Sequence, residues 1–148
     1  TARINGGQED KRMTAVTELI RTESDGSLSF GNHLLSTKAK KEDFENGGDL
    51  YKVKTYCEIT KLERNGMFVY ESVPGTSVEH FREDENGISF SVEGNEDAQL
   101  TLGLEDESQY DVKVNGQDAG RVCTNLGGKL SISVELAGAG EVKVEITK

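Results

Sequence analysis

The sequence predicts an all-β fold: a single-domain antiparallel β-sandwich or jelly roll with about nine to ten short strands. Apolar and polar residues alternate in short segments that fill most of residues 49–148, and this alternation gives each segment one apolar face. Glycine-containing turns separate the segments, and the chain has 17 glycines but one proline, Pro74. Both observations are typical of strands joined by tight turns.

The N-terminal third carries the weaker strand signals. Residues 16–20 fit either a strand or one turn of helix, because their apolar spacing suits both. Asp25 and Gly26 predict a turn before a short strand at residues 28–30. Residues 38–45 place lysines and acids around Phe44, which predicts a solvated loop or a single helical turn.

The middle of the chain contains the clearest hairpin. Residues 50–62 form the longest strand pattern, with Tyr51 at the start of its apolar face. Asn65 and Gly66 stand directly before residues 67–70, and an Asn-Gly pair between two strand patterns predicts a two-residue turn with positive φ at both positions. Further strand patterns follow at residues 78–80, 88–92, 100–104, 110–114, 122–124, 130–136 and 142–146.

The last of these patterns, residues 142–146, predicts a strand at the edge of a sheet. It follows a glycine-rich segment and carries charges of alternating sign at Glu141, Lys143, Glu145 and Lys148. Opposite charges on an edge strand can face a partner strand across a two-fold axis. We therefore expect these four residues to form a self-association edge; a monomer whose edge charges prevent pairing is the alternative.

The length suits one domain, which we place at residues 13–148. Residues 1–12 lack hydrophobic periodicity, and Met13 suits a translation start. Gln8, Glu9 and Asp10 can be encoded by codons containing AGGAGG, a bacterial ribosome-binding sequence. We expect residues 1–12 to be translated leader or cloning sequence; a genuine N-terminal arm, lying across a neighbouring subunit, is the alternative.

The charge and hydropathy of the chain restrict its partners. It has 27 acidic and 17 basic residues and a formal net charge of -10, which repels nucleic acid and anionic membrane surfaces. Neither a long apolar stretch nor a secretory leader is visible. These features favour a cytoplasmic protein that binds neither nucleic acid nor membranes.

Cysteine and histidine offer weak signals for chemistry. We expect Cys57 and Cys123 to be free, buried thiols in a reducing compartment; a disulfide between adjacent strands is the alternative. His33 and His80 share no close spacing with each other or with the cysteines, so neither a zinc site nor a cysteine–histidine nucleophile is indicated. We expect no metal and no cofactor.

Three acid-rich segments, residues 83–87, 93–97 and 105–107, predict solvated turns. None matches the ligand spacing of an EF-hand calcium loop. Glycoside hydrolysis needs a pair of carboxylates, but in so acidic a chain the presence of such pairs is not a specific signal.

A sugar-binding surface would need exposed aromatic rings, and the chain contains no tryptophan. The four tyrosines that could stack on sugars are Tyr51, Tyr56, Tyr70 and Tyr110, although strand alternation places most of them at core or cross-strand positions. A sialic acid carboxylate would also need a cation. The arginines of the strand-rich region are Arg64, Arg82 and Arg121.

Four segments resemble a known family: residues 49–54 (DLYKVK), 60–66 (TKLERNG), 70–76 (YESVPGT) and 124–130 (TNLGGKL). They are similar to short acidic proteins of anaerobic Gram-positive gut bacteria that carry the label "endosialidase". The resemblance covers about residues 13–148 and implies a bacterial, cytoplasm-like context. It implies no active site, because true endosialidases are large trimeric phage tailspikes with a propeller domain that this chain cannot contain.

These patterns favour a non-catalytic protein that acts as a self-associating structural or interaction module. An open sandwich leaves unpaired backbone groups on its edge strands, and pairing between subunits satisfies them. A carbohydrate-binding module, with a glycan as partner, is the second hypothesis. A small glycan-acting enzyme is the third.

Overall fold

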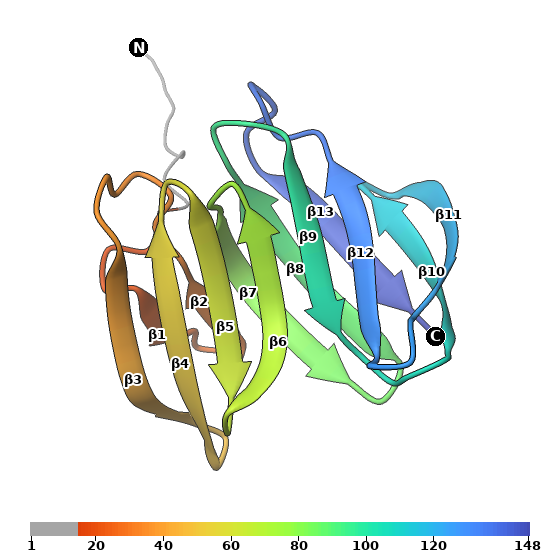
Figure 1. Cartoon of the computed structure of the whole chain (residues 1–148), viewed down its shortest axis with the longest axis horizontal. Helices are drawn as coiled ribbons and strands as arrows, with labels where there is room; N and C mark the ends of the chain where they lie inside the picture. Colours follow the sequence, from red (N-terminus) through yellow and green to blue (C-terminus); the bar gives the residue numbers. More distant parts are fainter. Residues whose placement is uncertain (1–14) are drawn as a thin grey trace.

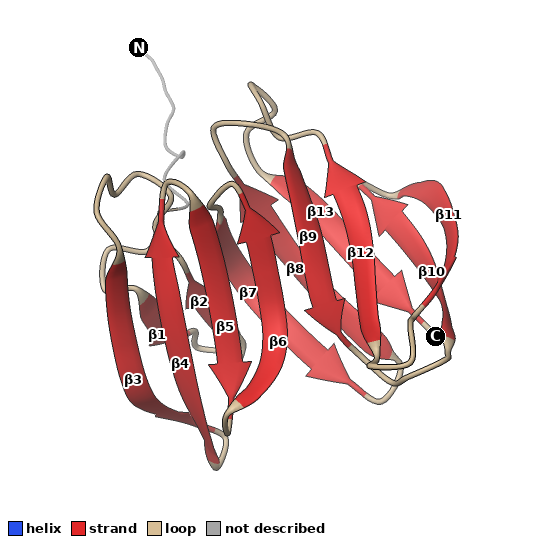
Figure 2. Cartoon of the chain, viewed as in Figure 1, coloured by secondary structure: helices blue, strands red, loops and turns tan. Residues whose placement is uncertain are grey.

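Two antiparallel β-sheets face each other in the computed structural model of this chain, which describes residues 15–148 (Figure 1). This range contains 13 strands and no helix (Figure 2). The predicted antiparallel β-sandwich is therefore confirmed. It has more strands than the number predicted from the sequence, which was about nine to ten. The prediction for residues 1–12 concerns residues outside the described range.

The larger sheet has seven strands in the order β1-β2-β7-β8-β13-β10-β11. Their bounds are β1 Ile20–Thr22, β2 Leu28–Phe30, β7 Ser77–Asp84, β8 Gly87–Glu93, β10 Gln109–Val114, β11 Gln117–Cys123 and β13 Val142–Thr147. The smaller sheet has six strands in the order β12-β9-β6-β5-β4-β3. Their bounds are β3 Ala39–Asn46, β4 Asp49–Tyr56, β5 Ile59–Arg64, β6 Met67–Val73, β9 Ala98–Gly103 and β12 Lys129–Val134.

Aromatic rings join the two sheets at the centre of the sandwich. Tyr70, on β6 of the smaller sheet, meets Phe30 and Phe90 of the larger sheet edge to face, at centroid distances of 5.3 and 5.7 Å. Phe81 stacks on Phe90 at 5.7 Å. All four residues are buried. Such pairs add stabilisation beyond the apolar area that they bury, so this cluster fixes how the sheets sit on one another.

The predicted hairpin at Asn65 and Gly66 is confirmed. β5 and β6 pair up to Arg64 opposite Met67, which leaves a two-residue turn with φ of 52° at Asn65 and 78° at Gly66. Two positive φ values give the turn a twist that matches the flanking strands. Asn65 also accepts a hydrogen bond from the N–H of Leu50 on its Oδ1 (2.9 Å), which ties the turn to β4.

Two other sequence predictions are wrong. The long strand predicted at residues 50–62 is two strands, β4 and β5, joined at Cys57 and Glu58. Neither residue has a positive φ, so the turn needs no glycine and left no glycine signal. The loop or helical turn predicted at residues 38–45 is the edge strand β3, whose two faces are both mostly solvated and therefore show no apolar alternation.

The position predicted for the C-terminal strand is also wrong. β13 lies inside the larger sheet, paired with β8 on one side and β10 on the other. Val144 and its apolar neighbours on β13 are buried, while Lys143 points to the solvated face. Glu145 lies opposite Lys113 of the same chain. The alternating charges thus belong to the outer face of an interior strand and not to an edge.

Candidate interaction edge

Four strands end the two sheets: β1 and β11 in the larger sheet, and β12 and β3 in the smaller one. An edge strand presents unpaired N–H and C=O groups to other chains, and proteins protect such edges with charges, bulges, irregular register or short length. A comparison of the four edges therefore identifies where a partner strand can add.

Three of the four edges carry such protection. β3 contains five charged residues and a register shift between Lys41 and Phe44, where Asp43 has a φ of 57°. β11 shifts register against β10 and has a φ of 109° at Gly120. β1 is three residues long, and Arg21 at its centre forms ion pairs with three glutamates.

β12 lacks these features. It pairs with β9 in an unbroken register from Lys129 opposite Gly103 to Val134 opposite Ala98. Its only charged residue is Lys129 at its first position, and it contains neither glycine nor proline. The outward side chains in its middle are serines, and Ser131 Oγ lies 3.1 Å from Thr101 Oγ1 on β9. β12 is thus a regular strand whose outer edge is free to pair.

The hydrogen bonds at the two ends of β12 show which backbone groups point outward. Leu104 N–H donates to Gly128 O (2.8 Å), and Leu136 N–H donates to Asp97 Oδ1 (3.0 Å), so even-numbered residues face β9. Because the direction alternates along an antiparallel strand, the N–H and C=O groups of Ser131 and Ser133 point away from β9.

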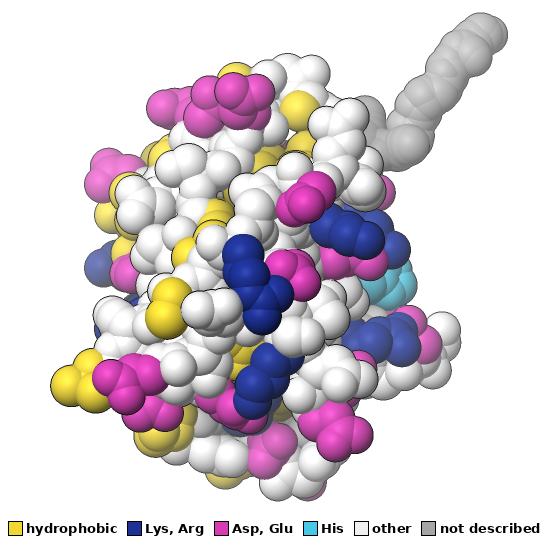
Figure 3. Space-filling model, turned by 90° about the vertical axis from the view of Figure 1, so that its right-hand side faces the viewer, with side chains coloured by type: hydrophobic (Ala, Val, Ile, Leu, Met, Phe, Trp, Pro, Cys, Tyr) yellow, Lys and Arg dark blue, Asp and Glu magenta, His cyan; other side chains and the backbone are white. Residues whose placement is uncertain are grey.

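The side chains around Ile132 are symmetric in character. The order is Lys129, Leu130, Ser131, Ile132, Ser133, Val134 and Glu135. Leu130 and Val134 are buried, whereas Ile132 between them is only half-buried. Figure 3 shows the side of the molecule on which β11 and β12 lie, where charged side chains of both signs are scattered among uncharged atoms. An apolar side chain on the core side of a free edge strand is what a second strand would cover.

The four tyrosines do not form the exposed stacking surface that sugar binding would need. Tyr51, Tyr70 and Tyr110 are 7%, 0% and 3% exposed, because strand alternation turns them inward. Tyr56 alone is half-buried, and its hydroxyl donates to Glu58 Oε1 (3.2 Å). Strand alternation thus places three of the four rings in the core, as expected, where they cannot stack on a sugar.

The arginines proposed as sialic acid ligands already have acidic partners. Arg64 Nη1 lies 2.7 Å from Glu83 Oε1, and Arg121 Nη1 lies 2.8 Å from Asp111 Oδ1. Arg82 pairs with Asp25. A hydrogen bond from the Ser27 hydroxyl is the main reason why the pKa of Asp25 falls to about 2, so this carboxylate stays ionised near neutral pH. An acidic ligand would therefore meet a carboxylate beside each of these arginines.

Cys57 and Cys123 are free, as expected, but both are exposed, so the prediction of buried thiols is wrong. Cys57 lies in the β4–β5 turn, and Cys123 ends β11. These positions belong to different sheets, and the alternative of a disulfide between adjacent strands does not apply.

The two histidines are far from equal in exposure. His80 is exposed, whereas His33 is buried and its Nδ1 lies 2.6 Å from Ser77 Oγ. Burial lowers the pKa of His33. A serine beside a histidine suggests a nucleophile, but Ser77 is fully buried and its Oγ also accepts a hydrogen bond from the His33 N–H (3.2 Å). A substrate carbonyl could not reach this oxygen, so the pair joins β7 to the segment after β2.

Within residues 15–148, no three histidine, cysteine or acidic side chains come together as metal ligands. The same part of the chain has no helix long and apolar enough to cross a membrane. In comparisons with known proteins, no family model, curated protein or solved structure matches this chain.

Proposed function

We propose that this protein is a non-catalytic self-association module whose copies pair through β12. The observation that carries the proposal is that β12 is the one unprotected edge among the four edge strands of residues 15–148. A second β12 would satisfy its outward N–H and C=O groups and extend the smaller sheet across two subunits.

The sequence of β12 favours antiparallel pairing about a two-fold axis at Ile132. In that register Ser131 lies opposite Ser133 of the second copy, and Lys129 lies opposite Glu135 of the second copy. The outward backbone groups of the serines then exchange N–H···O bonds, and the two Ile132 side chains meet in a non-hydrogen-bonded pair, where side chains come closest. In this register opposite charges face each other at Lys129 and Glu135, and apolar side chains face each other at Ile132.

The same comparison of edges predicts a closed dimer. A two-fold contact uses the same strand on both subunits and leaves no second copy of that strand free. The remaining edges are protected, so further strands do not add. Two chains of net charge -10 repel one another at low salt. Because exposed Lys–Glu pairs contribute only about 0–1 kcal/mol, screening of the overall repulsion dominates, and we expect association to strengthen at physiological salt.

Substitution of the two serines tests the proposal. Ser131→Lys with Ser133→Lys places lysine opposite lysine twice across the axis and should produce a monomer in light scattering, although it lowers the net charge that opposes association. Ser131→Lys with Ser133→Glu places lysine opposite glutamate and should keep the dimer.

A matched control carries the same two added charges elsewhere. Thr37→Lys with Gln117→Lys changes two exposed residues that lie outside β9 and β12, and should leave the dimer intact. The proposal fails if the wild-type protein is monomeric. It also fails if the double-lysine variant of β12 associates as strongly as this control.

A further inference from the structure

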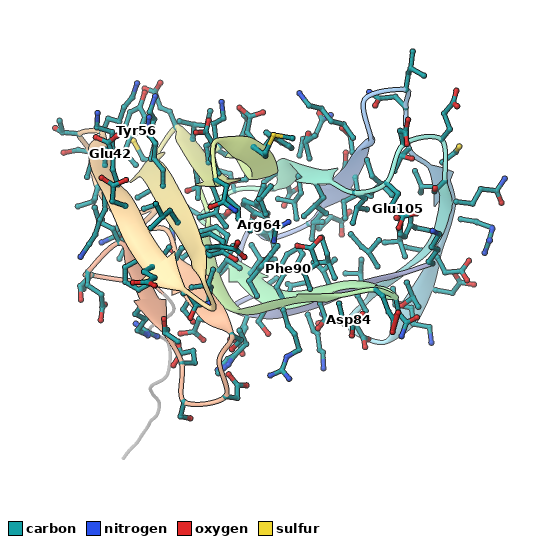
Figure 4. The ribbon with its side chains drawn as sticks, turned by 90° about the horizontal axis from the view of Figure 1, so that it is seen from below. Glu42, Tyr56, Arg64, Asp84, Phe90 and Glu105 are labelled. Carbon is teal, nitrogen blue, oxygen red and sulfur yellow. The ribbon has the colours of Figure 1, made fainter. Side chains whose placement is uncertain are left out.

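A polar groove runs between the two sheets at the end of the sandwich where the β5–β6, β7–β8 and β9–β10 turns lie (Figure 4). It consists of two chambers with volumes of about 480 and 290 Å³. Arg64 and Glu83 line both chambers, so this pair is their common wall. The groove includes Lys129, the first residue of β12, but none of Ser131, Ile132 and Ser133.

The Arg64–Glu83 pair bridges the sheets. Arg64 ends β5 of the smaller sheet, Glu83 lies on β7 of the larger one, and the Nη1–Oε1 distance is 2.7 Å. In Figure 4 Arg64 points into the space between the sheets. Burial alone would lower the pKa of Arg64, but hydrogen bonds to Glu83 and Tyr51 and the Glu83 charge outweigh it and raise the pKa. The side chains are 33% and 27% exposed, so the pair is sheltered yet reachable.

This pair keeps unused hydrogen-bonding capacity in a fixed position. A guanidinium has five N–H donors, and Arg64 commits donors to Glu83 and Tyr51. A carboxylate has about four acceptor sites, and Glu83 accepts from Arg64 at one of them. Donor and acceptor stand side by side, which suits a hydroxyl group, since a hydroxyl both donates and accepts.

The larger chamber adds an apolar surface, and both chambers add further polar groups. In the larger chamber, Lys129 Nζ lies 4.6 Å from the centre of the Phe68 ring. There the Tyr110 hydroxyl accepts the N–H of Glu105 (3.3 Å), which leaves its own hydrogen to donate. The smaller chamber is lined by polar residues that include Asp25, Asn46, Asp49 and Arg82, and by the buried residues Tyr51 and Phe81.

The charge of the groove selects against anions. The larger chamber is lined by four acids, Glu83, Asp84, Glu85 and Glu105, against two bases, Arg64 and Lys129. Both arginines of the groove, Arg64 and Arg82, have acidic partners. A carboxylate, sulfate or phosphate would meet net negative charge and no unpaired guanidinium.

We propose that this groove binds a neutral oligosaccharide, with one sugar unit on each side of the Arg64–Glu83 pair. Vicinal sugar hydroxyls fit adjacent donors and acceptors, and the apolar face of a sugar ring fits the half-buried Phe68 in the larger chamber. Because the chambers share one polar wall, a ligand that spans both should bind more tightly than a single sugar unit.

The test is a titration followed by amide NMR shifts, with lactose, maltotriose and diacetylchitobiose as neutral probes and sialyllactose as the acidic counterpart of lactose. At least one neutral probe should shift groove amides with a Kd of about 1 mM or below. Glucose alone should bind at least about tenfold more weakly, which is 1.4 kcal/mol. Sialyllactose should bind no more tightly than lactose.

Three variants locate the site. Arg64→Gln and Glu83→Gln should each weaken binding by about tenfold or more. Arg121→Gln removes an arginine of a second ion pair, one that is fully outside the groove, and should leave binding unchanged. Amide spectra of each variant check that it is folded. If Arg64→Gln does not fold, Glu83→Gln alone tests the site.

The proposal is overturned if no neutral probe shifts groove amides at about 10 mM, ten times the Kd expected. It is also overturned if both groove variants bind like the wild type, or if sialyllactose is preferred. None of these results tests pairing through β12. That proposal is tested separately, by the subunit mass measured on the same samples.

Discussion

Asn125 holds the backbone of Lys129 on the side away from β9. Asn125 N–H donates to Lys129 O (3.1 Å), and Lys129 N–H donates to Asn125 Oδ1 (2.9 Å). The first outward backbone groups of β12 are therefore occupied within the chain, and the free edge begins at Ser131. In a register shifted toward Lys129, a second strand would need the Lys129 N–H and C=O groups that Asn125 already binds. Pairing centred on Ile132 is therefore favoured.

A cysteine at position 132 should link two copies directly. In the pairing that we propose, the two Ile132 residues face each other in a non-hydrogen-bonded pair, with Cα atoms about 4.5 Å apart, which is within reach of a disulfide. With Cys57→Ser and Cys123→Ser to remove the exposed thiols, Ile132→Cys should give a dimer on non-reducing electrophoresis after mild oxidation. Leu130→Cys in the same background should not, because position 130 faces position 134; equal cross-linking of both would contradict this register.

Gly66→Val should lower the free energy of unfolding by roughly 1–3 kcal/mol in urea denaturation. The φ at Gly66 is 78°, which a β-branched residue adopts only under strain, and no atom lies within 4 Å of an added Cβ. The cost is therefore one of backbone conformation and not of a clash. Gly127→Val, at a glycine without positive φ, is the control, and an unchanged midpoint for Gly66→Val would argue against the strained turn.

Thr76 should matter more than its size suggests. Its Oγ1 lies 2.8 Å from both the Tyr70 hydroxyl and Ser72 Oγ in the buried core. Burial raises the pKa of Tyr70, so its hydroxyl stays neutral and bonded. Thr76→Val leaves both partners without this oxygen and should cost about 2–3 kcal/mol, against about 0.5–1.5 for Tyr70→Phe.

The double variant Thr76→Val/Tyr70→Phe checks this interpretation. Its loss of stability in urea should be smaller than the sum of the single losses by about 0.5 kcal/mol or more, since the tyrosine hydroxyl is no longer stranded. Strict additivity would mean that the two hydroxyls do not share a bond of any consequence.

Glu79 should make stability depend on pH. Burial, followed by a hydrogen bond and repulsion from Glu141, raises the pKa of Glu79 to about 7. An acid whose pKa is raised on folding stabilises the native state fully below its unfolded value of 4.5, and this contribution is lost as pH rises through 7. Glu79→Gln should therefore gain about 1–3 kcal/mol over the wild type at pH 8 but little at pH 4.5.

Urea denaturation at the two pH values measures this difference, with Glu85→Gln as the control at an exposed acid. The Arg21–Glu79 pair, with a 3.5 Å separation, is also lost in the variant, but an ion pair at the surface contributes about 0–1 kcal/mol. A gain of the same size at both pH values would show that the proton on Glu79 is not its cause.

Local sequence patterns predicted the features that depend on neighbours in the chain. The Asn65–Gly66 turn follows from the need for positive φ, and the inward rings of Tyr51, Tyr70 and Tyr110 follow from strand alternation. The turn at Cys57 was missed because ordinary backbone angles suffice there.

Features that depend on sheet order could not be predicted in this way. Alternating charge looks the same on an edge strand and on the outer face of an interior one, and β13 is interior because β10 pairs with it from a distance in sequence. The symmetry of residues 129–135 is visible in the sequence, but it has meaning only once β12 is known to be an edge. The end groove likewise joins Arg64 and Glu83 from two sheets.

The subunit mass in solution tests the central claim most directly. Size-exclusion chromatography with light scattering, from low to high micromolar protein and at low and physiological salt, should show a mass twice the 16.1 kDa of the chain at the upper concentrations, more completely at physiological salt, and no larger species. A mass of 16.1 kDa at high micromolar concentration in both salts would contradict pairing through β12.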